Sequence, residues 1–240
     1  MAISEDIKNE IITLLNTQWS TREGTTIPST DTVTLKNGSV KIDATFFYAD
    51  LAGSSVIAQN CPWQTTAKII RVYLNSATRL IKHYKGEIRS FDGDRVMGVF
   101  IGPAKNTNAV RCALALDWIV DEIIVPKTKF KFKSIRENNI TIKHCVGIDT
   151  GECRAVRAGI RDNNDLIWIG RAPSFAAKLS DIRKSPNAIW ITKKVYSAIN
   201  DDVKYATMDN EKINMWTSDK HSFANQDEQV YKTAYHWKPK

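Results

Sequence analysis

Two aspartates, each beside small residues and an apolar run, are the side chains of this sequence best suited to metal and phosphate chemistry. Asp50 closes the run FFYAD and precedes LAGSS, residues 51–55. Asp94 follows Asp92-Gly93, a hairpin-turn signal between two further apolar runs. Carboxylate oxygens are the ligands that Mg²⁺ and Mn²⁺ prefer, with water and phosphate in the remaining positions. One such aspartate alone is more often a turn residue, whereas the pair predicts a metal site.

The order of the predicted elements brings these two aspartates together. Residues 40–51 are predicted as a strand, and a helix follows Pro62, where apolar residues recur at steps of three and four. A hairpin over 87–102 and a helix over 104–123 come next. In a βαββ unit the first strand commonly neighbours the hairpin, so we expect both carboxylates at one end of one sheet. The Leu51 carbonyl is a candidate further ligand. A polyphosphate would meet the backbone N–H groups of one short segment, namely Leu51, Ala52, Gly53, Ser54 and Ser55.

The remainder of the chain predicts a mixed fold. Strands are expected at 140–149, 152–158, 165–169, 188–191 and 228–237, and helices at 172–181 and 193–199. The order from Val40 is βαββαβ followed by further elements, which predicts an α+β fold with a ferredoxin-like sheet core covered by helices. Residues 1–38 are predicted as an arm, with a helix over 4–15 and a polar linker, and residues 39–240 as a single domain.

Composition and charge argue against several other classes of protein. The 240 residues contain no run of about 18 apolar residues, so no membrane span is expected, and the acidic N-terminal stretch does not fit an export signal. The net charge is +8, and its densest basic stretch, 127–136, is predicted as a solvated edge strand or loop rather than a nucleic-acid surface. Four isolated cysteines predict buried reduced thiols in a cytoplasmic protein.

Five motifs, in order, resemble the class III nucleotidyl cyclase homology domain. The family pattern F-x-D-[IL]-x-G matches 47–53 with one residue's difference at the Phe, and G-D-x-x-[ML]-x-x-F matches GDRVMGVF at 93–100. The sequences at 146–152, 169–179 and 189–196 are similar to the family's next strand pair, its site helix, and the strand and helix that follow. Each motif alone has modest specificity, and together they cover residues 41 to 200.

The resemblance implies that a nucleoside triphosphate loses pyrophosphate and becomes a 3′,5′-cyclic nucleotide, with two Mg²⁺ or Mn²⁺ ions held by Asp50, Asp94 and the Leu51 carbonyl. The domain over 39–240 is then the catalytic domain. Because the family site lies between two domains, a head-to-tail homodimer with shared sites is implied. The family's second domain supplies an Asn and an Arg four residues apart. The matching positions are Ser174, with a hydroxyl for the sugar, and Lys178, with a charge for the phosphate but without the fork of Arg.

The family positions that read a purine base differ here. Adenylate cyclases have a Lys where this sequence has Ser90 and an Asp or Thr where it has Ile167, and the guanylate pattern is also absent. Ile167 cannot accept a hydrogen bond from adenine, so the pocket does not fit ATP, and Tyr48 is a candidate to narrow it. The pattern resembles the pyrimidine cyclases of the bacterial Pycsar anti-phage system, which make cyclic UMP or cyclic CMP for a separate effector. We favour UTP over CTP.

Two alternatives stay open at this point. One is a purine (adenylate) cyclase with a divergent base pocket. The other is a catalytically inert, cyclase-like regulator that binds nucleotide, because Ser174 and Lys178 both depart from the family pair. An RNA-binding ferredoxin-like module is disfavoured, since the predicted central strands lack the paired aromatics that stack on bases.

Overall fold

The computed structural model describes residues 2–239, and its centre is a large mixed β-sheet. Within the described residues the sheet has nine strands, in the order β10-β11-β7-β5-β2-β4-β3, with β1 paired to β2 and β6 paired to β5. A separate small sheet pairs β8 with β9. The strands are β1 (Ser20–Glu23), β2 (Gly38–Ala52), β3 (Glu87–Asp92), β4 (Arg95–Phe100), β5 (Lys143–Ile160), β6 (Asn163–Ile169), β7 (Ile189–Thr192), β8 (Tyr205–Met208), β9 (Glu211–Asn214), β10 (Thr217–Phe223) and β11 (Gln226–Thr233).

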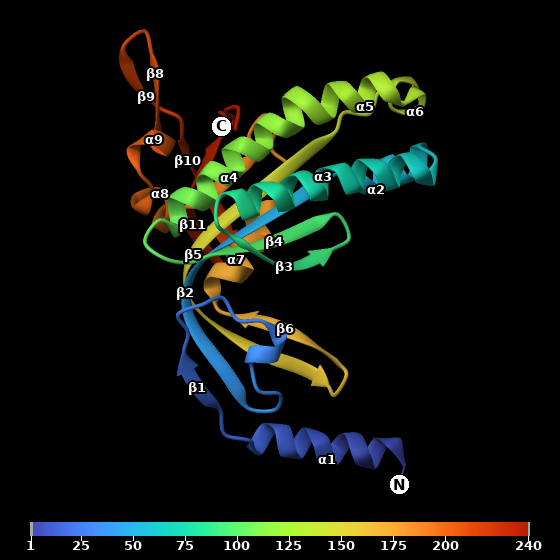
Figure 1. Cartoon of the computed structure of the whole chain (residues 1–240), viewed down its shortest axis with the longest axis vertical. Coiled ribbons are helices and arrows are strands. Elements are labelled where there is room, and N and C mark those ends of the chain that lie inside the picture. The colour runs from blue at the N-terminus through green and yellow to red at the C-terminus, as the bar shows by residue number, and fades with distance from the viewer. Residues whose placement is uncertain (1, 240) are drawn as a thin grey trace.

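Helices cover both faces of this sheet (Figure 1). The longest are α3, at 21 residues, and α4, at 15 residues, which pack on one face, whereas α7 packs on β5 and β2 from the other. The helices are α1 (Ile3–Asn16), α2 (Ser54–Asn60), α3 (Trp63–His83), α4 (Lys105–Ile119), α5 (Val125–Lys131), α6 (Lys133–Glu137), α7 (Arg171–Ser180), α8 (Lys193–Ala198) and α9 (Asp201–Lys204). Short 3₁₀ and π-helical segments lie at Thr30–Thr32 and Val120–Ile124.

The central part of the sheet follows the predicted ferredoxin-like order. The chain runs β2-α3-β3-β4-α4-β5, and the strands lie side by side as β5-β2-β4-β3. β2 is antiparallel to both β4 and β5, with Phe47 opposite Gly98 on one side and Ile148 on the other. The prediction of an α+β fold with a βαββαβ core is therefore confirmed.

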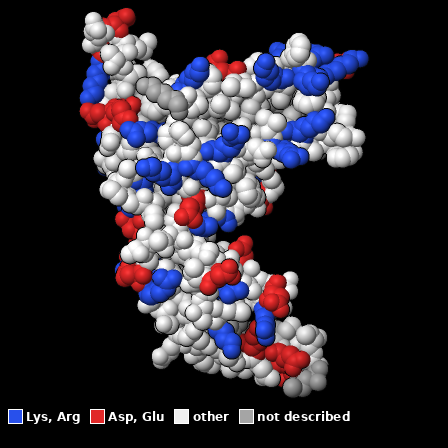
Figure 2. Space-filling model, viewed as in Figure 1, with Lys and Arg blue, Asp and Glu red and all other residues white. Residues whose placement is uncertain are grey.

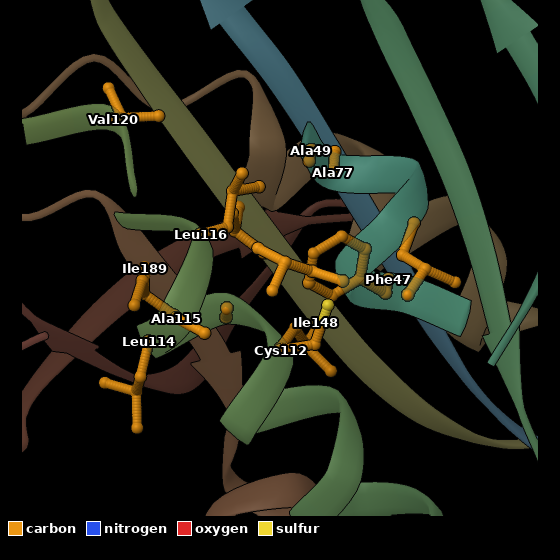
Figure 3. Close-up of a cluster of buried hydrophobic side chains, with 14 of the residues drawn as sticks. Phe47, Ala49, Ala77, Cys112, Leu114, Ala115, Leu116, Val120, Ile148 and Ile189 are labelled. Carbon is orange, nitrogen blue, oxygen red and sulfur yellow. The ribbon is translucent and has the colours of Figure 1, made fainter. Parts of the chain in front are cut away.

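The main hydrophobic core lies between this sheet and α3 and α4. Phe47 and Ala49 of β2 face Ala77 of α3 and Leu116 of α4, and all four are fully buried (Figure 3). On α3 the buried residues Ile69, Tyr73, Ala77, Leu80 and Ile81 recur at steps of three and four. The helix is as predicted, but its buried face is rotated from the expected apolar series, in which Ala67 is exposed and Ile70 and Leu74 are only partly buried. This packing fixes β2, and with it the strand end that carries Asp50.

The opposite face of the sheet holds α7 at very close range. Gly147 of β5 lies under α7, and a Cβ atom added there would come within 2.1 Å of the Ala176 carbonyl oxygen. The buried side of α7 includes Phe175, Ala176 and Leu179, whereas Ser174 and Lys178 are exposed. Helix and sheet approach this closely only because position 147 has no side chain.

The prediction of an edge strand or loop at 127–136 is wrong, because this basic segment is helical. α4 continues through a π-helical turn into α5, and α6 follows directly. The side chains that face inward are Ile124 and Thr128, four residues apart, and Ile135 of α6, while the lysines between them are exposed. In the sequence, Lys alternates with apolar residues at every second position, which is typical of a strand, so the pattern did not indicate a helix. Figure 2 shows the resulting basic side chains at the α5–α6 end, and others scattered among acids over the same face.

Two further expectations need correction in detail. The strands predicted at 140–149 and 152–158 form one continuous strand, β5, which passes through Gly151 and is 18 residues long. The polar stretch predicted as a linker contains β1, which pairs with Ser39 and its neighbours in β2, and its residues Ile27 and Val33 are buried in a second core cluster. Whether residues 1–38 act as a separate arm stays a prediction.

The cysteines and the helices also bear on what the composition predicts about thiols and membrane spans. The four cysteines are free and buried, as predicted. Among the described residues, no helix combines the length and the apolar character needed to cross a bilayer. α1 has no buried residue, and Figure 1 shows it at the opposite end of the molecule from α3, α4 and α5.

Candidate active site

Asp50 and Asp94 lie together at one end of the sheet. Asp50 is near the end of β2, opposite Arg95 at the start of β4, and Asp94 occupies the turn that joins β3 to β4. The Leu51 backbone N–H donates to the Asp94 carbonyl oxygen at 3.4 Å. The register of two antiparallel strands therefore brings together two acids that are 44 positions apart in the sequence.

Burial and the neighbouring charge of Asp94 both act on the Asp50 carboxylate. Asp50 is 8 % exposed, and burial raises its pKa, with the negative charge of Asp94 as the next cause. The guanidinium groups of Arg183 and Arg95 act in the opposite direction. A buried carboxylate beside a second carboxylate is stabilised by a cation, and both supply the hard oxygen ligands of Mg²⁺ or Mn²⁺. This donor set fits a divalent ion.

The cation at Asp50 in this structure is Arg183, a residue that the sequence did not point to. Its guanidinium donates to Asp50 Oδ2 and, through its other terminal nitrogen, to the Ser180 carbonyl oxygen at 2.7 Å. The segment that follows α7 is also tied to the hairpin, because Asp181 lies 3.5 Å from Arg95. No motif marks Arg183, since 133 positions separate it from Asp50 and only the fold joins them.

The segment after Asp50 turns sharply into a helix. Leu51 is buried and lies opposite His144 of β5, and Ala52 ends the strand opposite Lys143. Gly53 has a φ of 74°, in the left-handed region that glycine adopts most readily, and α2 begins at Ser54. The proposed roles of the Leu51 carbonyl and of the backbone N–H groups of 51–55 stay predictions.

Tyr48 and Ser90 lie in one row across three strands. Tyr48 of β2 and Ser90 of β3 each pair with Met97 of β4, and the Tyr48 hydroxyl donates to Met97 Sδ at 3.1 Å. Tyr48 is half-buried, burial raises the pKa of its phenol, and the Arg95 guanidinium lies 5.6 Å from its ring centre. Tyr48 and Asp50 are two positions apart on the same strand and share a face.

The hydrogen bonds and ion pairs of Asp50 do not include the other predicted site residues. Ile167 is 46 % exposed on β6 and pairs with Val156 of β5, about 35 Å along that strand from Cys145, the partner of Asp50. Ser174 and Lys178 lie on the exposed side of α7, and the Ser174 hydroxyl donates to the Gly170 carbonyl oxygen at 3.2 Å. These residues face away from their own sheet.

A second group of ionisable side chains lies at a pocket of about 470 Å³. Asp117, Asp121 and His236 could together hold a metal ion. Asp117 is buried and bonded to His144 at 2.8 Å and to His236 at 3.3 Å. The residues that line the pocket include Ala52 and Arg183 as well as Asp117 and Asp121, so it adjoins the Asp50 end of the sheet.

Known proteins resemble the chain over nearly its whole length. A uridylate cyclase of Rhodovulum sp. (strain MB263) is 41 % identical over 239 residues, which cover 100 % of this chain and 99 % of that protein. A uridylate cyclase of Burkholderia cepacia is 38 % identical, covering 90 % and 91 %, and one of Xanthomonas perforans is 39 % identical, covering 82 % and 86 %. No family model matches the sequence.

The chain belongs to the class III nucleotidyl cyclases. Solved structures agree with this fold: the adenylyl cyclase CyaB of P. aeruginosa superimposes with a TM-score of 0.62 at 21 % identity, over 81 % of this chain and 95 % of that one. The guanylyl cyclase Cya2 gives 0.65 at 16 % identity, over 83 % and 95 %. The cyclase resemblance predicted from the motifs is thus confirmed, and this cyclase is an enzyme of the nucleotidyl cyclase type.

Proposed function

We propose that this cyclase converts UTP into 3′,5′-cyclic UMP and pyrophosphate, with CTP as the alternative pyrimidine substrate. The observation that carries the proposal is the 38–41 % identity, over most of the chain, to three proteins named uridylate cyclase. The exposed Ile167 side chain supports it, because an aliphatic group cannot form the hydrogen bonds by which a purine would be read.

In the proposed reaction, Asp50 and Asp94 hold divalent ions, with the Leu51 carbonyl as a further ligand. Bound there, such ions would acidify the ribose 3′-hydroxyl and neutralise phosphate charge. The 3′-oxygen attacks the α-phosphorus, the bond to the β-phosphate oxygen breaks, and pyrophosphate leaves. Ser174 contacts the ribose and Lys178 stabilises the negative charge that develops on the transferring phosphate. Positioning and electrostatics supply the catalysis, so no covalent nucleophile is needed.

The substrate assignment is tested with ATP, GTP, CTP and UTP, each incubated with the enzyme and Mn²⁺ and analysed by mass spectrometry. We expect cyclic UMP to form at least about 100-fold faster than cyclic AMP. The Asp94→Asn variant serves as the blank for contaminating cyclases. A predominance of cyclic AMP would instead establish the divergent adenylate cyclase, and the absence of every cyclic product would establish the inert regulator.

We further propose that the active enzyme is a head-to-tail homodimer with two shared sites. Ser174 and Lys178 support this, because they face solvent on α7 while Asp50 lies at the sheet end of the same chain. A second copy would supply its α7 to the first copy's aspartates.

Sharing of the site predicts complementation between two inactive variants. Asp94→Asn and Lys178→Ala should each lose most activity alone, yet co-expression should restore about one quarter of it, because half of the dimers are mixed and each mixed dimer has one intact site. The matched control is co-expression of Asp94→Asn with Asp50→Asn, which damage the same half-site and should restore nothing. Equal results for the two pairs would contradict the shared site.

The biological role that we propose is a second-messenger synthase in anti-phage defence, with the cyclic pyrimidine nucleotide read by a separate effector. It is supported by the motif resemblance to the pyrimidine cyclases of that system, while the three relatives support the cyclic nucleotide product.

A further inference from the structure

Arg183 connects Asp50 to the neighbouring pocket. Its guanidinium donates to Asp50 Oδ2, while the side chain is 42 % exposed and lines the pocket. It follows α7 in the segment that Asp181 anchors to Arg95, so its backbone is held in place near the two aspartates. The partly exposed side chain can therefore change its partner without unpacking the core.

The Asp50 carboxylate cannot keep this partner when it serves as a metal ligand. The two proposed ions would together use both oxygens of Asp50, one of which accepts from Arg183 here, and their positive charge would repel the guanidinium. A guanidinium released from Asp50 needs another anion, because an unpaired charge beside a half-buried site is unfavourable. The bound triphosphate would bring one.

The pocket beside Arg183 offers a second positive charge, that of Lys143, to the anionic triphosphate. Lys143 and Ala52 pair in adjacent strands, and both line the pocket with Arg183. Lys143 is two positions from Cys145 on β5 and so shares its face, and Cys145 in turn is close enough to Asp50 and Arg183 for both charges to affect its pKa. Asp117 and Asp121 also line the pocket, and Asp117 is already hydrogen-bonded to His144 and His236.

We propose that Arg183, together with Lys143, binds the two terminal phosphates of the triphosphate, which depart as pyrophosphate, and that Arg183 rests on Asp50 when no nucleotide is bound. This inference rests on the proposed cyclase reaction and adds the residues that hold its leaving group. Arg suits the role because its planar fork matches two phosphate oxygens at once. The exchange keeps the guanidinium paired with an anion in both states.

The adjacent Lys184 provides a matched control. It borders the same pocket, but its ammonium group lies 5.7 Å from the centre of the Trp190 ring, so it already has an aromatic partner. Lys184→Gln removes the same charge from the same segment as Arg183→Gln. A merely general effect of positive charge would therefore appear equally in both variants.

The test measures pyrophosphate as the probe. In the full-length enzyme, Arg183→Gln and Lys143→Gln should weaken calorimetric binding of pyrophosphate with Mg²⁺ by about 10- to 100-fold, Arg183→Lys should weaken it less, and Lys184→Gln should leave it within about 2-fold. Circular dichroism melting checks that each variant is folded. Unchanged binding in folded Arg183→Gln, or an equal loss in Lys184→Gln, would overturn the proposal.

A second measurement follows Arg183 in the nucleotide-free enzyme. Mn²⁺ binding, read from free Mn²⁺ by electron paramagnetic resonance, should become about 10-fold tighter in Arg183→Gln, because a competing cation is gone from Asp50. Weaker or equal Mn²⁺ binding would count against the resting position. An enzyme that binds pyrophosphate through Arg183 but turns over none of the four triphosphates would refute the proposed function and retain this inference.

Discussion

Replacing Asp94 by Asn should lower cyclase turnover by about 10³-fold or more while leaving the chain folded. Asn is the same size as Asp but offers one weaker oxygen ligand and no charge, so the pair with Asp50 would no longer hold a divalent ion over the triphosphate. Asp50→Asn should have an effect of the same order. The measurement is steady-state formation of the cyclic nucleotide at saturating Mn²⁺, combined with thermal melting of each variant.

The stability of the Asp94→Asn variant should not fall together with its activity, because the charge of Asp94 is unfavourable for ionised Asp50. Burial and the charge of Asp94 raise the pKa of Asp50 in the folded state. An acid whose pKa is raised by folding is less favourable in its ionised form, so it costs stability as pH rises above its unfolded pKa, and this cost is present at neutral pH. Removing the Asp94 charge takes away one cause of the raised Asp50 pKa, and with it part of this cost to stability. The melting temperature of Asp94→Asn should therefore equal or exceed that of the wild type.

The neighbouring Asp92 gives a control within the same turn. Its carboxylate lies 3.0 Å from Arg95 and is 78 % exposed, so the pair contributes little to stability. Asp92→Asn removes an equal charge from the same hairpin and should retain turnover near that of the wild type. Comparable activity in the Asp94→Asn and Asp92→Asn variants would reject the assignment of Asp94.

The two aspartates show which features of the site could be predicted from the sequence. An apolar strand ending in Asp50, a helix, and a hairpin with Asp-Gly at its turn leave few arrangements for the sheet, so the approach of Asp50 to Asp94 follows from local patterns. Local signals also placed Ser174 and Lys178 on one helix. Each of these candidate residues lies within or next to an element whose pattern is visible in the sequence.

Features that depend on contacts between distant segments were not predictable in this way. Arg183 meets Asp50 only because α7 and β2 pack side by side, and nothing near position 183 signals that partner. The basic segment over 127–136 shows the opposite problem: its local alternation favours a strand, but burial of Thr128 and Ile135 against the body selects a helix. In the first case tertiary packing creates a contact that no local pattern indicates, and in the second it overrides the local preference for a strand.

The close approach of α7 to β5 predicts the largest effect on stability. Gly147→Ala should destabilise the folded chain by about 3 kcal/mol or more, because the added Cβ would lie 2.1 Å from the Ala176 carbonyl oxygen and 2.4 Å from the Ser180 nitrogen. Both are backbone atoms of α7, so no side chain can rotate away, and the helix itself must move. Denaturant unfolding monitored by circular dichroism measures the change.

Gly98→Ala separates this steric effect from the general consequence of adding a methyl group to the sheet. At Gly98 of β4 the three atoms nearest to the new Cβ all belong to the Ile81 side chain, at 3.1 to 3.3 Å, and that side chain can adjust. Gly98→Ala should lower the free energy of unfolding by no more than about 1 kcal/mol. Because α7 carries Ser174 and Lys178 and leads into Arg183, Gly147→Ala should also lose activity under conditions where it is still folded. A stable but inactive Gly147→Ala would mean that α7 can shift on the sheet at little cost, whereas wild-type stability together with wild-type turnover would show that the helix does not approach the strand as closely as Gly147 allows.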